Sequence, residues 1–127
     1  MLLLKAFADG STALSQIQKK WPGPKFGHDL QLHVGPVASG AAVLADPNVV
    51  DEVKEQQRQL VGVEMEVFGV FTAAENCSKP RPTTFALKSV CDFGDQGKSD
   101  EHQAYAAFTS AEFLYRFALE ELYETTT

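Results

Sequence analysis

The sequence has little positive charge. It contains 11 lysine and arginine residues against 17 aspartate and glutamate residues, which gives a formal net charge of −6. Three of the basic residues are arginines (Arg58, Arg81 and Arg116), and the only adjacent basic pair is Lys19–Lys20. Proteins that bind nucleic acids gather lysine and arginine into a patch or stripe. We therefore expect no nucleic-acid partner.

Long apolar runs are also absent. The three leucines at positions 2–4 form a run too short for a signal peptide, and no segment reaches the roughly 20 residues that cross a bilayer. We therefore expect no membrane partner and a cytoplasmic location.

Cysteine and histidine are few and dispersed. Cys77 and Cys91 lack a CxxC spacing, so buried thiols are the first interpretation, with a disulfide or a reactive thiol as the second. His28, His33 and His102 lie far apart in the sequence. We therefore expect neither a metal site nor a cofactor.

What is present is the composition of an ordinary globular domain. Hydrophobic residues make up 44% of the 127 residues and charged residues 22%. A chain of this length buries roughly two thirds of its unfolded surface, which is enough for one domain with a modest core.

Four helices are predicted, three of them from a capping residue at the start and one from a change to helical spacing. They run from Ser11 or Thr12 to Lys20, from Pro47 (capped by Asp46) to Gln59, from Met65 to Cys77, and from Ser99, as cap, to Tyr123. In the last helix we expect a buried face formed by Ala104, Ala107, Phe108, Ala111, Leu114, Phe117 and Ala118.

Strands are predicted between these helices. They cover residues 30–40 (with a break at Gly35–Pro36), 60–64 and 83–91, and glycine and proline place loops at 21–27, 78–82 and 92–100. Strands that alternate with helices predict an α/β fold with a mainly parallel or mixed sheet flanked by helices.

Acidic residues follow two of the predicted strands. In LVGVEMEVFGV (60–70), Glu64 and Glu66 lie either side of Met65, and Asp92 follows the strand at 83–91. Ligands gather at the carboxyl ends of parallel strands, so we expect these acids in one crevice. The residues alone leave another interpretation open: a solvated helix start for the two glutamates, a core role for Met65 and a turn cap for Asp92.

Three sequence blocks carry a resemblance to a known family. SGAAVLAD (39–46), GVEMEVFGV (62–70) and SVCDFGDQGK (89–98), followed by an alanine-rich helix, resemble the C-terminal half of the purine nucleoside phosphorylase superfamily, which includes the methylthioadenosine/S-adenosylhomocysteine nucleosidases. The resemblance covers residues 33–120. It implies a partial nucleoside-phosphorylase-like α/β fold and cleavage of a purine nucleoside's N-glycosidic bond by phosphate, as co-substrate, or by water.

The resemblance implies that Met65 and Glu66 hold the ribose and that Glu64 lies near the base. This assignment suits the chemistry of the residues. A carboxylate can accept charge-assisted hydrogen bonds from two neighbouring sugar hydroxyls, and a thioether offers an adaptable apolar surface to the sugar ring.

On the base side, the resemblance makes Asp92 the catalytic acid that protonates the departing purine, a step worth about 10²–10⁴-fold in rate. It places Val43 over the base and makes Cys91, which precedes Asp92, a further substrate contact.

The chain also departs from the family pattern. It has no glycine-rich phosphate loop before residue 30 and no arginine before Arg58. Ala41 stands where aspartate is common, Val43 offers no aromatic ring to the base, and Cys91 replaces a frequent serine or threonine.

We therefore expect one incomplete domain, with a poorly matched helix and loop at 1–29, a family-like core at 30–123 and a frayed tail at 124–127. Such a chain should be inactive alone. It should expose an apolar surface that a second copy of the chain or a missing N-terminal half would cover. The alternative function is a non-catalytic nucleoside-sensing or protein-interaction module.

Overall fold

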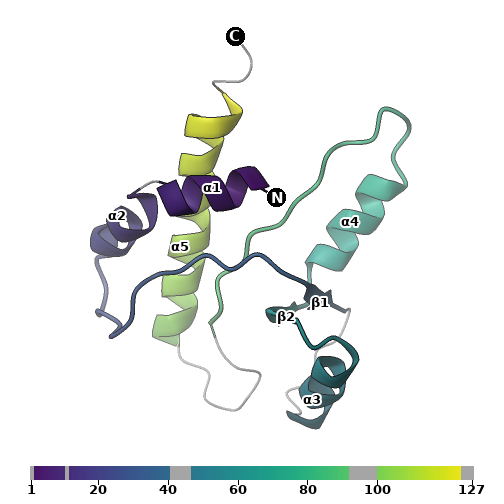
Figure 1. Ribbon diagram of the computed structural model, residues 1–127, viewed down its shortest axis with the longest axis horizontal. Helices are drawn as coiled ribbons and strands as arrows, with labels where there is room; N and C mark the ends of the chain where they lie inside the picture. Colours follow the sequence, from purple (N-terminus) through teal and green to yellow (C-terminus); the bar gives the residue numbers. More distant parts are fainter. Residues whose placement is uncertain (1, 11, 41–46, 92–99, 124–127) are drawn as a thin grey trace. The chain divides into compact units, whose positions relative to one another are not determined.

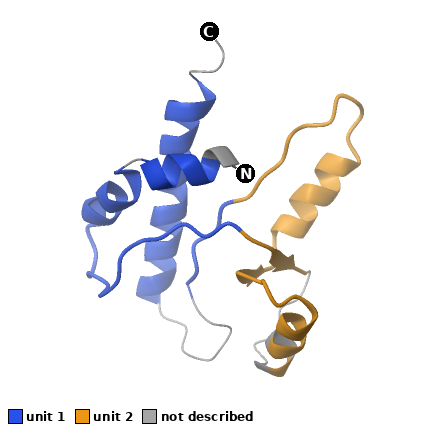
Figure 2. Cartoon of the chain, viewed as in Figure 1, with its two compact units in different colours: residues 1–34, 87–92, 97–127 blue, residues 35–86, 93–96 orange. Residues whose placement is uncertain are grey.

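The computed structural model describes residues 2–10, 12–40, 47–91 and 100–123 (Figure 1). These residues form five α-helices, one π-helical segment and a two-stranded sheet, which confirms the predicted α/β class. The chain divides into two compact units, coloured separately in Figure 2. Unit 1 comprises residues 1–34, 87–92 and 97–127, and unit 2 comprises residues 35–86 and 93–96.

Unit 1 is built from helices. These are α1 (Leu2–Gly10), α2 (Ala13–Lys20), α5 (Asp100–Phe117) and the π-helical segment η1 (Ala118–Leu122). Its core forms where Phe7 of α1 meets Phe113 and Phe117 of α5, with all three rings buried. Ile17 of α2 is completely buried in the same cluster.

Two of the helices in unit 1 were predicted from the sequence, and one was not. α2 ends at Lys20 as expected, and α5 with η1 extends to Leu122, one residue short of the expected end. The predicted cap Ser99 lies outside the described residues. α1 was missed because its leucine-rich start lacks a capping signal. Its residue Phe7 is buried against α5, a helix about 100 residues away in the sequence.

The buried face of α5 differs from the predicted one. The structure buries Ala106, Thr109, Phe113 and Phe117. Of the predicted face, Phe117 is buried and Phe108 and Ala118 are half-buried, whereas Ala104, Ala107, Ala111 and Leu114 are exposed. Alanine contributes little apolar area, so packing follows the two large rings of Phe113 and Phe117, which lie one turn apart on the same face.

The segment after α2 was predicted to begin a strand at residue 30, and this part of the prediction is wrong. Residues 30–34 are not a strand, and their leucines, Leu30 and Leu32, pack against the core of unit 1. The side-chain amide of Gln18, rather than a neighbouring strand, forms hydrogen bonds with the backbone of this segment. Its Nε2 donates to the carbonyl of His28 (2.8 Å), and its Oε1 accepts from the N–H of Leu30 (3.1 Å).

The predicted loop at 21–27 is confirmed, and its aromatic residues pack on α5. The ring of Trp21 lies 5.5 Å from that of Tyr105 and 5.1 Å from that of Phe108. The ring of Phe26 lies 4.7 Å from that of Tyr105. Partial burial desolvates the phenol and raises the pKa of Tyr105 above its ordinary value of 10.0.

The strand predicted at 83–91 is also absent, since these residues form neither helix nor strand. Their β-branched and aromatic residues favour a strand only where a neighbouring strand offers hydrogen-bond partners. The second part of the segment is instead tied to α5. Leu87 packs against the core of unit 1, and the hydroxyl groups of Ser89 and Thr109 lie 2.7 Å apart in a hydrogen bond.

Unit 2 contains the sheet. β1 (Val37–Ser39) and β2 (Gly62–Glu64) are parallel, with Val37 opposite Gly62 and Ser39 opposite Glu64. β1 follows the predicted break at Gly35–Pro36, and β2 covers the last three residues of the predicted strand at 60–64. The strands are therefore shorter than expected, and the predicted carboxyl end of the second is correct.

Two helices complete unit 2. α3 (Pro47–Gln56) ends three residues before the predicted Gln59, and its predicted cap Asp46 lies outside the described residues. α4 (Val67–Glu75) lies inside the predicted span 65–77, and the loop at 78–82 follows it as predicted.

α4 is apolar around most of its circumference, yet it exposes large side chains. Phe68, Val70 and Phe71 are 53%, 57% and 39% exposed. A helix with apolar residues on all sides is ordinarily buried. None of the described helices is both long and apolar enough to cross a membrane.

Candidate functional site

The predicted site residues Glu64, Met65 and Glu66 lie where β2 passes into α4. Glu64 is the last residue of β2 and is only 7% exposed. Its Oε2 atom accepts hydrogen bonds from the backbone N–H groups of Glu66 (2.8 Å) and Val67 (2.9 Å). The buried carboxylate therefore holds the first turn of α4.

A second side chain reaches the same helix end from the neighbouring strand. Ser39, the last residue of β1, accepts a hydrogen bond at Oγ from the N–H of Phe68 (2.8 Å). Ser39 and Glu64 are partners in the parallel register, so both caps come from the carboxyl ends of the two strands. Sequence reasoning missed this role of Ser39, although Ser39 begins the first of the three family-like blocks.

The N-terminus of a helix carries partial positive charge and often binds phosphate through its N–H groups. At α4 the carboxylate of Glu64 occupies two of these groups. An external anion would have to displace Glu64 to bind there.

Met65 and Glu66 form the exposed corner between the strand and the helix. Met65 is 47% exposed, and Glu66 is exposed at the N-cap position of α4. The two residues predicted to hold a sugar are thus consecutive in the chain just after a strand end, and Glu64 binds the backbone N–H of Glu66. This arrangement can offer a carboxylate and an apolar thioether to a small polar molecule.

The structure does not test the placement of the remaining predicted residues. Val43 and Asp92 lie outside the described residues. Cys91 belongs to unit 1 and is half-buried. Cys77, for which burial was the first interpretation, is exposed just beyond α4, so that interpretation is wrong for this thiol. No disulfide links the two thiols.

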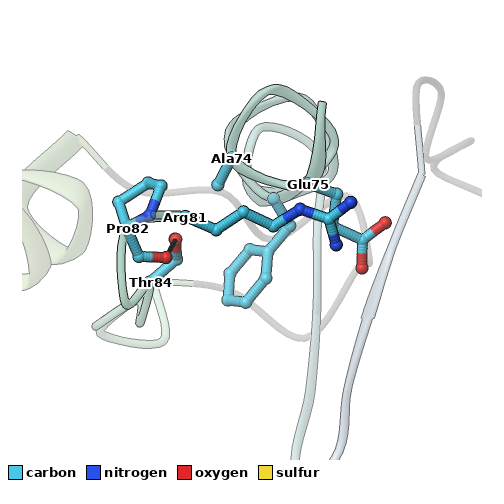
Figure 3. Close-up of a pocket in the computed structure, with 6 residues that line it drawn as sticks. Ala74, Glu75, Arg81, Pro82 and Thr84 are labelled. Carbon is cyan, nitrogen blue, oxygen red and sulfur yellow. Dashed lines mark hydrogen bonds between the residues drawn. The ribbon is translucent and has the colours of Figure 1, made fainter. Parts of the chain in front are cut away.

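A shallow hollow of about 200 Å³ lies at the other end of α4 (Figure 3). It is lined by Phe71, Ala74, Glu75, Arg81, Pro82 and Thr84. The side chain of Arg81 runs across it toward Glu75. With a rise of 1.5 Å per residue, Glu75 lies about 12 Å along the helix from Val67, so the hollow is separate from the Met65–Glu66 corner.

A metal-binding cluster is not found in the part of the chain that the structure describes. Within it, no three histidine, cysteine, aspartate or glutamate side chains gather in a way that could hold an ion.

Comparison with known proteins finds distant relatives. An uncharacterized protein of Sinorhizobium fredii, y4jS, is 33% identical over 109 residues, which are 86% of this chain and 26% of that protein. The ATP nucleosidase Cap17 of Escherichia coli is 29% identical over 75 residues, which are 59% of this chain and 14% of that protein. The chain thus spans about a quarter of the first relative and about a seventh of the second.

No family model and no solved structure matches the chain. The similarity to an ATP nucleosidase nevertheless agrees with the nucleosidase-like character that the three sequence blocks imply.

Proposed function

We propose that this chain is the nucleoside-binding part of a nucleosidase-like protein that cleaves the N-glycosidic bond of a purine nucleoside or nucleotide. The observation that carries the proposal is the corner at the carboxyl end of β2. There, the consecutive residues Met65 and Glu66 are both exposed, and Glu64 fixes the backbone between strand and helix. The distant similarity to an ATP nucleosidase supports the same reaction class.

In this proposal the Glu66 carboxylate accepts hydrogen bonds from the two ribose hydroxyls, and the Met65 thioether lies against the sugar ring. Val43 lies over the base, with Glu64 and Cys91 nearby. The C1′–N9 bond breaks with its electron pair going to the base, Asp92 gives its proton to N7, and water or phosphate forms the new bond to C1′. In an assembled enzyme, Asp92→Asn should lower base release about 10²-fold or more.

The chain itself is proposed to bind without turnover. It contains no glycine-rich loop to hold a phosphate nucleophile before residue 30, and it spans a small part of the ATP nucleosidase that it resembles. Incubation with adenosine, inosine or ATP should therefore release no free base. Detection of free adenine or hypoxanthine by chromatography would contradict this part of the proposal.

The binding test is calorimetric titration of the whole chain with adenosine, inosine and ATP. Glu66→Gln keeps the shape of the side chain but removes its charge, and it should weaken the preferred ligand about tenfold or more. Glu52→Gln, at an exposed glutamate of α3 in the same unit, is the matched control and should bind normally. If none of the three ligands binds, the nucleoside-binding function is wrong.

One observation favours the second candidate, a non-catalytic sensing or protein-interaction module. α4 exposes the large apolar side chains of Phe68, Val70 and Phe71, although a helix that is apolar on all sides is ordinarily buried. Sedimentation of the chain with and without ligand would distinguish the two candidate functions. If the chain self-associates to the same extent with and without nucleoside, and calorimetry detects no nucleoside binding, the interaction module is supported.

A further inference from the structure

The backbone N–H groups at the first turn of α4 all have hydrogen-bond partners. A helix leaves its first N–H groups without partners inside the helix. Here the N–H groups of Glu66 and Val67 donate to Glu64, and the N–H of Phe68 donates to Ser39. The next N–H, of Gly69, bonds to the carbonyl of Glu66 (3.1 Å). Every amide of this turn is therefore held.

The bonds to Ser39 and Glu64 connect the turn to both strands. Glu64 lies two residues before Glu66, while Ser39 comes from the neighbouring strand and reaches Phe68 two residues after Glu66. The backbone of Glu66 is thus held on both sides. Movement of its Cα atom relative to the strand ends requires at least one of these bonds to break.

We propose that Ser39 and Glu64 form a clamp on α4 that positions Glu66, and that Ser39 is thereby a positioning residue for sugar recognition. The second half of this statement rests on the nucleoside-binding function proposed above. Ser39 itself need not touch the ligand, because its hydroxyl oxygen is directed at the N–H of Phe68.

The hydroxyl of Ser39 can be removed without preventing the chain from folding. The hydrogen bond between Phe68 and Ser39 is at an exposed position, so water can replace the hydroxyl when it is removed. A Ser39→Ala chain should therefore fold, with a looser first turn of α4. Ser39→Thr keeps the hydroxyl on the same carbon and should restore the clamp.

The first measurement is amide hydrogen exchange of the whole chain, which needs no ligand. Loss of a capping hydroxyl ordinarily costs about 1 kcal/mol, so the Phe68 amide should exchange roughly fivefold faster in Ser39→Ala. Ser39→Thr should remain within about twofold of the wild type. Ser78→Ala, an exposed serine in the same unit, is the matched control and should leave this amide unchanged. Unchanged exchange of Phe68 in Ser39→Ala overturns the clamp.

The second measurement compares two ligands, adenosine and 2′,3′-dideoxyadenosine, which lacks the hydroxyls that Glu66 would bind. Ser39→Ala should raise the Kd of adenosine roughly fivefold and leave that of the dideoxy compound unchanged. Equal weakening of both ligands would indicate general destabilisation and overturn the positioning role. If the wild-type chain binds neither ligand, the proposed function is wrong, and the positioning role is wrong with it. The exchange rate of the Phe68 amide still decides whether the clamp exists.

Discussion

Phe7 and Phe113 meet edge to face with their ring centroids 5.6 Å apart, and this contact joins the first helix of the chain to the last α-helix. Phe117, one turn further along α5, meets the same ring of Phe7 at 5.7 Å. The core of unit 1 therefore depends on three rings from two ends of the sequence.

Phe113→Ala should destabilise unit 1 strongly. Phe113 is 4% exposed, and removing a buried phenyl ring costs about 3–5 kcal/mol through lost burial and the cavity that remains. Urea unfolding followed by circular dichroism measures the change. Tyr115→Ala is the matched control on the same helix, because Tyr115 is 62% exposed and its loss should cost less than about 1 kcal/mol. Similar losses for both variants would contradict the assigned core.

The two glutamates of the β2–α4 corner should differ in their contribution to stability. Glu64→Ala removes the acceptor of two backbone N–H groups and should lower the free energy of unfolding by about 1–2 kcal/mol. Glu66→Ala, at an exposed side chain, should cost about 0.5 kcal/mol or less. Thermal unfolding of the two variants makes the comparison. The reverse order would mean that Glu64 does not cap α4.

Burial raises the pKa of Tyr105, and this predicts a loss of stability at high pH. The folded chain retains the phenol proton to higher pH than the unfolded chain, so above the ordinary pKa of 10.0 the unfolded state releases its proton first. The free energy of unfolding is therefore unaffected by Tyr105 ionisation below pH 10, and it decreases as the pH rises further.

The measurement for Tyr105 is the melting temperature between pH 9 and pH 11. Tyr105→Phe keeps the ring contacts with Trp21 and Phe26 and should fall less steeply with pH than the wild type. Parallel curves for Tyr105→Phe and the wild type would show that the phenol is not desolvated.

The two thiols should react at different rates. Cys77 is exposed, whereas Cys91 is half-buried, and access limits the reaction of a thiol with a bulky reagent. A chromogenic aromatic disulfide should label one thiol per chain in a fast phase and the second in a slow phase. Cys77→Ser should abolish the fast phase, and Cys91→Ser the slow one. Loss of the fast phase in Cys91→Ser instead would reverse the assigned exposures.

Local signals predicted most of the helices. α2, α3 and α4 follow capping residues, proline or a change from strand-like to helical spacing, and each of these signals lies within a few residues of the element itself. α1 and the buried face of α5 could not be predicted in this way. Both depend on the meeting of Phe7 with Phe113, a contact between distant parts of the sequence.

The same distinction applies to the site. The sequence places Glu64, Met65 and Glu66 at a strand end because all three are neighbours in the chain. Ser39 could not be assigned a partner, because its bond to Phe68 depends on the register that pairs Ser39 with Glu64. The strand expected before Asp92 failed for a related reason, since β propensity does not reveal whether a neighbouring strand is present.

The amide of Gln18 has a consequence for association with other chains. By donating to His28 and accepting from Leu30, it makes the two contacts that an added β-strand would otherwise seek along this segment. An extended stretch with leucines at alternate positions would ordinarily invite such edge-to-edge pairing. The side chain of one polar residue in the preceding helix therefore prevents residues 28–30 from pairing with a strand of another chain.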